Sequence, residues 1–164
     1  MTKIGIVSDT HVGEENIEIL ENVSKHFKGV DLILHAGDVT QQKVLNELST
    51  IAPVIAVKGN ADSLDLNLTE IIIVNNFKIA LNHGMDLSDN YEKLYEFGKS
   101  QGADIVITGH THKPHFKFTN NMCLVNPGSL NKPIDSKASV AILNIDKEEK
   151  LISNIKVNII ELEE

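Results

Sequence analysis

The stretch DIVITGHTHKPHF, residues 104–116, joins an apolar run to a pair of histidines. The apolar residues predict a buried strand over Asp104–Thr108, which ends at Gly109. His110 and His112 follow, with one residue between them. Two imidazoles at this spacing are uncommon at the end of a buried strand, and imidazole is the commonest metal ligand in proteins. The stretch therefore indicates a metal site whose other ligands must come from elsewhere in the chain.

The composition is that of an ordinary globular protein. The 164 residues, 41% hydrophobic and 23% charged, suit one domain over residues 1–164. A strand-like run begins at Lys3, so no secretion leader is expected, and no apolar run approaches the roughly 20 residues of a membrane span. Cys123 is the single cysteine, which excludes an internal disulfide and favours a reducing compartment. We therefore expect a cytoplasmic protein that does not bind membranes.

The charge of the chain limits its partners. A formal net charge of −8 argues against general nucleic-acid binding, which needs a basic surface. All 15 basic residues are lysines, so no guanidinium group can hold a phosphate in two parallel hydrogen bonds. A phosphate would have to be bound by metal ions, lysine, imidazole, amides or backbone N–H groups.

Short apolar runs alternate with amphipathic segments through the first two thirds of the chain, which predicts an α/β sheet with helices outside it. The strands expected there are Lys3–Ser8, Asp31–His35, Val54–Lys58, Ile71–Val74, Lys78–Asn82 and Asp104–Thr108, and the helices are Glu14–Phe27, Gln41–Ser49 and Asn90–Ser100. After His112 the pattern predicts strands alone: His115–Thr119, Met122–Asn126, Ser139–Ile145 and Leu151–Ile160. This tail should form a second sheet or extend the first, within a single domain.

Five of the predicted strands end in a potential metal ligand. These residues are Asp9 and His11, Asp38, Asn60, His83, and His110 with His112. Binding sites in open α/β sheets form at the carboxyl ends of the strands, so the side chains should meet. The neighbouring glycines, Gly37, Gly59, Gly84 and Gly109, allow the backbone to turn sharply or to approach a ligand closely.

Each of these residues has a simpler interpretation when it is taken alone. An aspartate after a strand usually caps a turn, and a single histidine at a boundary is usually satisfied by packing. Agreement among five strand ends is what favours metal binding. Seven ligands exceed the needs of one first-row ion, and the mixture of imidazole and oxygen suits Mn, Fe, Ni, Co or Zn. Two ions that share one carboxylate are the natural division, and such pairs promote displacement at phosphorus.

In their order, these motifs resemble those of the calcineurin-like metallophosphoesterases. The matching motifs are DTH (Asp9, His11), GDV (Asp38), GNAD (Asn60), NHG (His83) and GHTH (His110, His112). The length of the chain and the NPGSL stretch at Asn126–Leu130 are similar to the small YfcE-type phosphodiesterases of this family. The resemblance implies a four-layer αββα sandwich.

The resemblance also implies a role for each ligand. Asp9, His11 and His112 would hold the first ion, Asn60, His83 and His110 the second, and Asp38 would bridge both. Both ions would be divalent metals, with manganese expected and nickel, iron, cobalt or zinc as alternatives. Gly37, Gly59, Asp62 and Gly109 would support the loops around the site.

The activity implied is hydrolysis of a small phosphodiester or nucleotide-like substrate by in-line attack of a metal-bound hydroxide. Asp38 and Asn60 are the residues expected to take part in catalysis. Asn60 could serve twice, because its amide oxygen can bind metal while its NH₂ group donates to the phosphate.

The chain departs from the larger family members at two positions. Ala61 replaces their general-acid histidine, and Gln41 replaces the aspartate that orients it. General acid catalysis contributes about 10²–10⁴-fold, so poor leaving groups should react slowly here. Asp62 could act as an acid, although capping of its loop is the favoured interpretation. Lys132 or Lys137 could supply a point charge, although a solvated lysine is favoured for both.

Two other functions share these motifs. A non-catalytic metal-binding scaffold is one, because the scaffold subunit of the retromer complex resembles this branch and works through protein contacts. A phosphomonoesterase or nucleotide pyrophosphatase is the other. All seven ligands are present in this chain, which favours catalysis. A homodimer is also possible, since dimers are the commonest oligomers.

Overall fold

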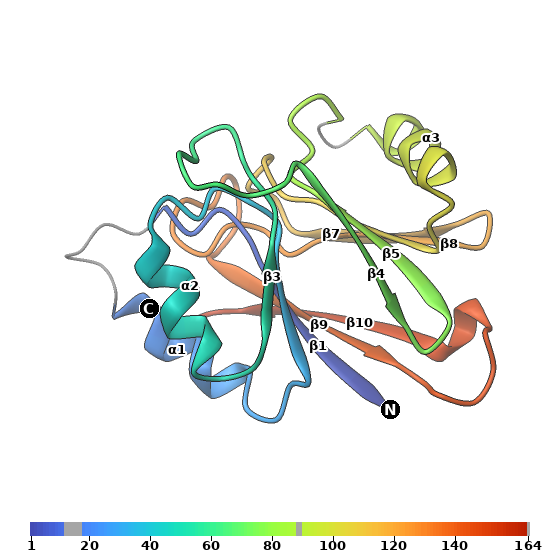
Figure 1. Cartoon of the computed structure of the whole chain (residues 1–164), viewed down its shortest axis with the longest axis horizontal. Coiled ribbons are helices and arrows are strands. Elements are labelled where there is room, and N and C mark those ends of the chain that lie inside the picture. The colour runs from blue at the N-terminus through green and yellow to red at the C-terminus, as the bar shows by residue number, and fades with distance from the viewer. Residues whose placement is uncertain (12–17, 88–89, 164) are drawn as a thin grey trace.

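The computed structural model describes residues 1–11, 18–87 and 90–163, which form two five-stranded sheets and three α-helices (Figure 1). The first sheet has the order β10-β9-β1-β2-β3 and contains β1 (Thr2–Val7), β2 (Leu32–His35), β3 (Val54–Ala56), β9 (Ser139–Ile145) and β10 (Ile155–Glu161). The second has the order β4-β5-β6-β8-β7 and contains β4 (Thr69–Val74), β5 (Phe77–Asn82), β6 (Ile105–Ile107), β7 (His115–Thr119) and β8 (Met122–Asn126). The helices are α1 (Ile19–His26), α2 (Gln42–Ser49) and α3 (Tyr91–Gln101).

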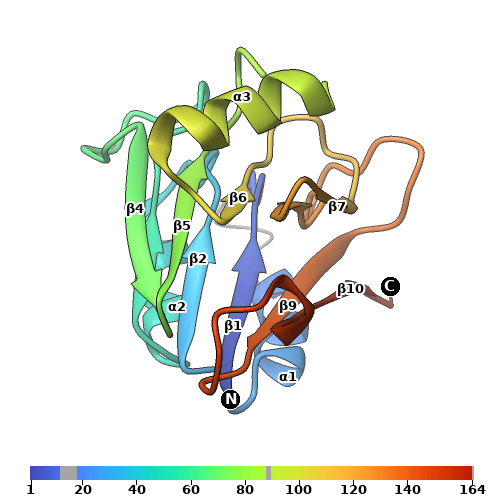
Figure 2. The ribbon, with the colours of Figure 1, turned by 90° about the vertical axis from the view of Figure 1, so that its right-hand side faces the viewer.

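The two sheets pack face to face, and the helices cover their outer faces (Figures 1 and 2). Alternation along each strand produces this arrangement, because successive side chains point to opposite faces of a sheet. Buried Ile4 and Ile6 of β1 belong to the cluster between the sheets, which also contains Ile79 of β5. Another group of buried apolar residues joins the first sheet to α1 and α2, and a further group joins the second sheet to α3. The predicted four-layer αββα sandwich is therefore confirmed.

Parallel pairing brings the functional strand ends to one edge. β1, β2 and β3 run parallel to one another, as do β5, β6 and β8. Their carboxyl ends lie at the end of the sandwich away from the N-terminus (Figure 1). The loops that follow these six strands are therefore neighbours, although they are far apart in the sequence.

The C-terminal tail is divided between the sheets rather than assigned to one of them. β7 and β8 extend the second sheet beside β6, whereas β9 and β10 extend the first sheet beside β1. The two alternatives offered by the sequence therefore both occur, because β8 and β9 are both apolar strands that either sheet could bury.

Some predicted boundaries were wrong. The segment predicted as a strand over Leu151–Ile160 begins instead with a 3₁₀ turn at Ile152–Asn154. The side chain of Asn154 donates to the carbonyl of Glu149 over 2.7 Å, which stabilises a turn there in place of extended backbone. The first helix was predicted from Glu14, but residues 14–17 lie outside the described part of the chain, and α1 is described from Ile19. Across residues 1–11, 18–87 and 90–163, no helix has the length and apolar character needed to cross a membrane.

Candidate metal centre

All seven predicted ligands meet at the shared edge of the strands. They follow β1 (Asp9, His11), β2 (Asp38), β3 (Asn60), β5 (His83) and β6 (His110, His112). Their side chains form two groups that touch at Asp38. We call these the first cluster (Asp9, His11, His112) and the second cluster (Asn60, His83, His110).

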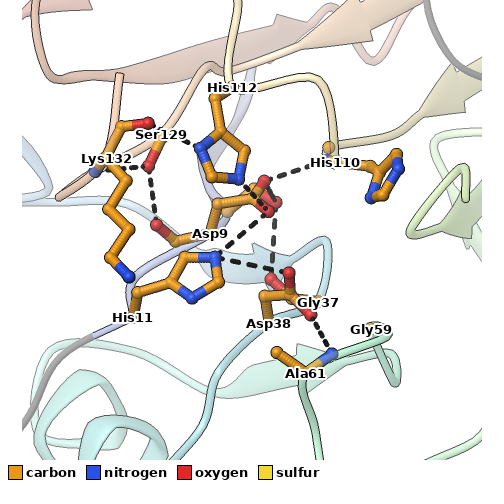
Figure 3. Close-up of polar contacts among 12 residues, drawn as sticks. Asp9, His11, Gly37, Asp38, Gly59, Ala61, His110, His112, Ser129 and Lys132 are labelled. Atoms are coloured by element: carbon orange, nitrogen blue, oxygen red, sulfur yellow. Dashed lines mark hydrogen bonds and ion pairs between the residues drawn. The ribbon is translucent and has the colours of Figure 1, made fainter. Parts of the chain in front are cut away.

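The first cluster is centred on Asp9, with Asp38 beside it (Figure 3). One possible ligand atom from each of Asp9, His11, Asp38 and His112 lies within 4.8 Å of the other three. His112 Nε2 is 3.2 Å from Asp9 Oδ1, and His11 Nε2 is 3.7 Å from the same oxygen. Two imidazoles therefore converge on one buried carboxylate.

The second cluster is tighter. Asn60 Oδ1 lies 2.9 Å from His83 Nε2 and 3.1 Å from His110 Nδ1. The two imidazole nitrogens are 3.2 Å apart. One amide oxygen and two ring nitrogens therefore point at a common position. These are the ligand types that the sequence predicted for a second ion.

Asp38 joins the two clusters. Its Oδ2 atom is 3.3 Å from His11 Nε2 in the first cluster and 3.3 Å from His83 Nε2 in the second. Its Oδ1 atom accepts a hydrogen bond from the backbone N–H of Ala61 over 2.8 Å. The predicted bridging residue therefore lies between the two groups.

Five of the seven residues have left-handed backbone dihedrals, which non-glycine residues rarely adopt. Their φ angles are 51° for Asp9, 40° for His11, 56° for Asp38, 72° for His110 and 62° for His112. Each such residue costs on the order of 1 kcal/mol or more, and residues of this kind cluster at functional sites. The fold tolerates this cost where it aims the side chains at one another.

Three glycines leave the space that the clusters require. A Cβ atom on Gly59 would overlap the backbone and carboxylate of Asp38. A Cβ atom on Gly109 would lie 2.6 Å from Asp9 Oδ2 and would overlap the Ser8 hydroxyl. Gly37, with a φ of +100°, packs against the His83 ring in the same way. These overlaps show that the backbone at the three glycines packs closely against side chains of the site.

Asp62 caps the loop that carries Asp38. Its Oδ2 atom accepts from the N–H groups of Asp38 (3.0 Å) and Gly59 (2.8 Å), and its Oδ1 atom accepts from Thr40 N–H (2.7 Å). The favoured interpretation of Asp62 as a loop cap is thus confirmed, and the carboxylate is already committed to backbone donors.

Several supporting residues were not identified from the sequence. Ser8 donates to Asp9 Oδ2 over 2.6 Å, and the Ser129 hydroxyl donates to the Asp9 carbonyl over 2.8 Å. Asn126 donates to the Gly109 carbonyl over 3.0 Å. Asn126 and Ser129 belong to the NPGSL stretch, so the motif was visible but its structural role was not.

Two of the histidines have one ring nitrogen fixed by the backbone. His83 Nδ1 donates to the Ala36 carbonyl over 2.7 Å, and His112 Nδ1 donates to the Lys132 carbonyl over 2.5 Å. Each Nε2 atom is then the ring nitrogen directed into the site, where it could bind a metal. Metal-binding histidines are typically held in this way.

The charges of the site are strongly coupled. Burial would raise the pKa of Asp38, but His11, His83 and the Ala61 N–H outweigh it and hold that pKa well below its usual range. For Asp9, burial is likewise outweighed, mainly by His11 and the Ser8 hydroxyl, and its pKa is lowered. The carboxylates of Asp38 and Asp9 raise the pKa of His11 to about 9. Burial opposes protonation of His83, but Asp38 and Asp9 still raise its pKa.

The donor atoms fit a cation. Asp9 Oδ1 and His11 Nε2 are buried, and neither makes a hydrogen bond within the described residues. Buried polar atoms are rarely left in this state unless something else binds them. Carboxylate oxygen together with imidazole nitrogen is also a typical ligand set for first-row divalent metals.

The positions that depart from the larger family members carry no acid–base pair. Ala61 uses its backbone N–H to bind Asp38, and Gln41 precedes α2 without a capping side-chain hydrogen bond. Of the two lysine candidates, Lys137 pairs with Glu161 (3.8 Å), away from the clusters. Lys132 is linked to the site through its carbonyl, and its side chain extends in the direction of His11 (Figure 3).

The chain is similar to known proteins over most of its length. The family described as the calcineurin-like phosphoesterase superfamily domain matches residues 2–148. A probable metallophosphoesterase of Methanocaldococcus jannaschii is 40% identical over 153 residues, which cover 91% of this chain and 80% of the relative. A phosphodiesterase of the same organism is 28% identical over 164 residues, covering 90% of this chain and 95% of the relative. The crystal structure of wild-type Vps29 from Entamoeba histolytica, complexed with Zn²⁺, has a TM-score of 0.77 at 26% identity, covering 98% of this chain and 99% of that one.

Proposed function

The chain belongs to the calcineurin-like phosphoesterase superfamily, and on that premise we propose that it is a phosphodiesterase with two divalent metal ions. The observation that carries this proposal is the position of Asp38, whose Oδ2 atom lies 3.3 Å from one histidine of each cluster. A single carboxylate between two sets of ligands is what a two-metal site requires.

The division of ligands follows the clusters. Asp9, His11 and His112 would hold one ion, Asn60, His83 and His110 the other, and Asp38 both. Divalent cations at these positions would supply charge that stabilises phosphoryl oxygens and lowers the pKa of a water molecule. Manganese is the expected metal. Zinc is supported by the Zn²⁺ complex of the Entamoeba histolytica relative, and nickel, iron and cobalt suit the same ligands.

Asn60 is suited to contact both metal and substrate. Its Oδ1 atom faces His83 and His110, whereas its Nδ2 atom makes no hydrogen bond to any described residue. The side chain is exposed, so the NH₂ group can donate to a phosphoryl oxygen. Asp38 contacts one histidine of each cluster and would bind both ions.

The substrate class follows from what the site lacks. Ala61 and Gln41 offer no proton to a departing alkoxide, and Asp62 is committed to three backbone N–H groups. Diesters with leaving groups of low pKa should therefore react best, because they depart without protonation. The relative named as a phosphodiesterase supports a diester in preference to a monoester.

The proposal is tested by hydrolysis of bis-p-nitrophenyl phosphate. Chelator-treated protein is titrated with Mn²⁺, and p-nitrophenyl phosphate is assayed alongside. We expect activity that saturates at two ions per chain and favours the diester, is abolished in Asp38→Asn and is retained in the exposed control Asp65→Asn. Preference for the monoester would instead support a phosphomonoesterase with the same metal site.

The likeness to Vps29 favours one alternative, a metal-binding scaffold that works through protein contacts. Two ions bound tightly with no turnover of either ester would move the assignment to this function. A cytoplasmic location and a homodimer remain predictions from the sequence.

A further inference from the structure

We propose that a pocket beside the second cluster binds an apolar, ring-sized substituent of the phosphodiester. This inference rests on the proposed function and specifies its substrate class. The pocket has a volume of about 630 Å³, which lies in the range of small-molecule sites. Asn60 and His83 form its wall on the side of the metal centre.

Four apolar side chains also line the pocket. They are Leu68 before β4, Met85 and Leu87 after β5, and Phe97 on α3. The loops before β4 and after β5 reach the same end of the molecule as the metal centre (Figures 1 and 2). Leu68 is 68% exposed and Met85 is 53% exposed. A ligand that covers large exposed apolar side chains lowers the free energy of the complex, because apolar surface is removed from water.

The polar side chains of the pocket are mostly committed to the protein. Asn82 donates to the Leu68 carbonyl (3.2 Å) and to Thr69 Oγ1 (2.9 Å), and its Oδ1 atom accepts from Gly84 N–H (2.7 Å). Asp62 is occupied by its three backbone donors. The pocket therefore has few groups with which to read hydrogen-bonding edges, and it should select an apolar ring by shape and burial.

Lys58 and Asp86 are the exceptions among these polar groups. Both line the pocket, and neither forms an ion pair with any described residue. Their opposite charges leave no net attraction for an anion at this wall. An aryl or nucleoside-like ester of phosphate would therefore keep its negative charge at the metal centre and place its apolar ring in the pocket.

The pocket lies beside the second cluster and not beside the first. Asn60 and His83 of the second cluster line it, whereas Asp9, His11 and His112 of the first cluster do not. A phosphate placed between the clusters would therefore have one substituent directed into the pocket and the other directed away from it. The two arms of a diester would be recognised by different surfaces.

The test compares two diesters with the same charge. Binding of diphenyl phosphate and dimethyl phosphate to the Mn²⁺-loaded protein is measured by calorimetry. Burial of a phenyl ring should make diphenyl phosphate bind about tenfold or more tightly than dimethyl phosphate. Leu68→Gln and Met85→Gln should each reduce this ratio about threefold to tenfold.

Ile73→Gln is the matched control, because Ile73 on β4 is 69% exposed but does not line the pocket. It should leave the ratio unchanged. Equal affinity of the wild-type protein for the two diesters would overturn the proposal. It would also be overturned if Leu68→Gln and Met85→Gln kept the same ratio of diphenyl to dimethyl phosphate affinity as Ile73→Gln. The proposed function is tested by a different measurement. If it is wrong, bis-p-nitrophenyl phosphate is not hydrolysed, whereas the ratio of the two binding affinities can still be measured.

Discussion

The carboxylate of Asp62 accepts a hydrogen bond from the backbone N–H of Asp38 over 3.0 Å. The same carboxylate binds Gly59 N–H and Thr40 N–H, so it ties the loop after β2 to the loop after β3. Asp38 is held in left-handed backbone geometry, with a φ of 56°. Asp62 therefore fixes the bridging residue in a conformation that it would not adopt by itself.

Asp62→Ala should lower the free energy of unfolding by about 3 kcal/mol, because three donors would lose an ionised acceptor. It should also weaken metal binding and slow hydrolysis. Asp62→Asn, which retains one acceptor oxygen, should show smaller losses. Denaturant unfolding and Mn²⁺ titration measure both effects.

The dependence of the hydrolysis rate on the leaving group distinguishes this positioning role of Asp62 from acid catalysis. Loss of a positioning residue should slow aryl diesters with good and poor leaving groups to the same extent. Loss of a general acid would slow the poor leaving groups more. A steeper dependence of rate on leaving-group pKa in Asp62→Asn would contradict the role assigned here.

The ligands were predictable from the sequence for a physical reason. The carboxyl ends of parallel strands align within a sheet, and this predicts that the ligands following them meet. Asp38 and His83 follow strands of different sheets, and the face-to-face packing of the two sheets places Asp38 Oδ2 3.3 Å from His83 Nε2. The αββα layers were predictable as well, from the resemblance and the alternation of elements.

Other features were not predictable because they depend on tertiary contacts. The left-handed backbone at His110 and His112 follows from packing, and neither residue type specifies it. The division of the tail was hidden because β8 and β9 have the same apolar pattern but join different sheets. The role of Ser129 depends on a hydrogen bond to Asp9, which is 120 positions away in the chain.

Gly59→Ala should abolish tight metal binding. The added methyl group would overlap both the backbone and the carboxylate of Asp38, so the bridging oxygen would have to move. Gly29→Ala is the control, since Gly29 has a φ of +81° but nothing lies within 4 Å of an added Cβ atom. That control should lose about 1 kcal/mol of stability and keep its Mn²⁺ affinity. Equal Mn²⁺ affinities in the two variants, measured by calorimetry, would refute the steric argument.

His35 should make the protein sensitive to mild acid. It is fully buried, its Nδ1 atom accepts from Gly37 N–H (3.1 Å), and its Nε2 atom lies 3.2 Å from the Thr10 hydroxyl. Burial lowers its pKa from 6.5 to about 4. Between these values the unfolded chain binds a proton that the folded chain does not, so stability falls as pH decreases from 6.5 to 4.

The expected loss over that range is about 3 kcal/mol in chelator-treated protein. Denaturant unfolding at pH 6.5, 5 and 4 measures it. His35→Asn should reduce the slope of the unfolding free energy against pH by about 1.4 kcal/mol per pH unit, whereas His26→Asn on α1 should leave that slope unchanged. Parallel curves for wild type and His35→Asn would show that His35 is protonated in the folded state.

Lys132 should contribute to substrate binding. Its carbonyl accepts from His112 Nδ1, and its N–H donates to Ser129 Oγ over 2.8 Å, so its backbone is fixed to the first cluster. Lys132→Met should raise KM for the diester about threefold to tenfold, and the effect should decrease with added salt. Lys137→Met is the control, because Lys137 pairs with Glu161. KM values for wild type and both variants at low and high ionic strength decide the matter, and equal KM values for Lys132→Met and Lys137→Met would exclude this role.

Asn60→Asp should separate metal binding from turnover. The new carboxylate keeps an oxygen directed at His83 and His110, so Mn²⁺ affinity should be retained or increased. It loses the NH₂ donor and places a negative charge against the phosphate, so kcat should fall about 10²-fold. Asn46→Asp makes the same change on the exposed face of α2 and should leave both quantities unchanged. Metal content and kcat measured on the same preparations give the answer, and unchanged turnover in Asn60→Asp would show that the Asn60 NH₂ group does not contact the phosphate.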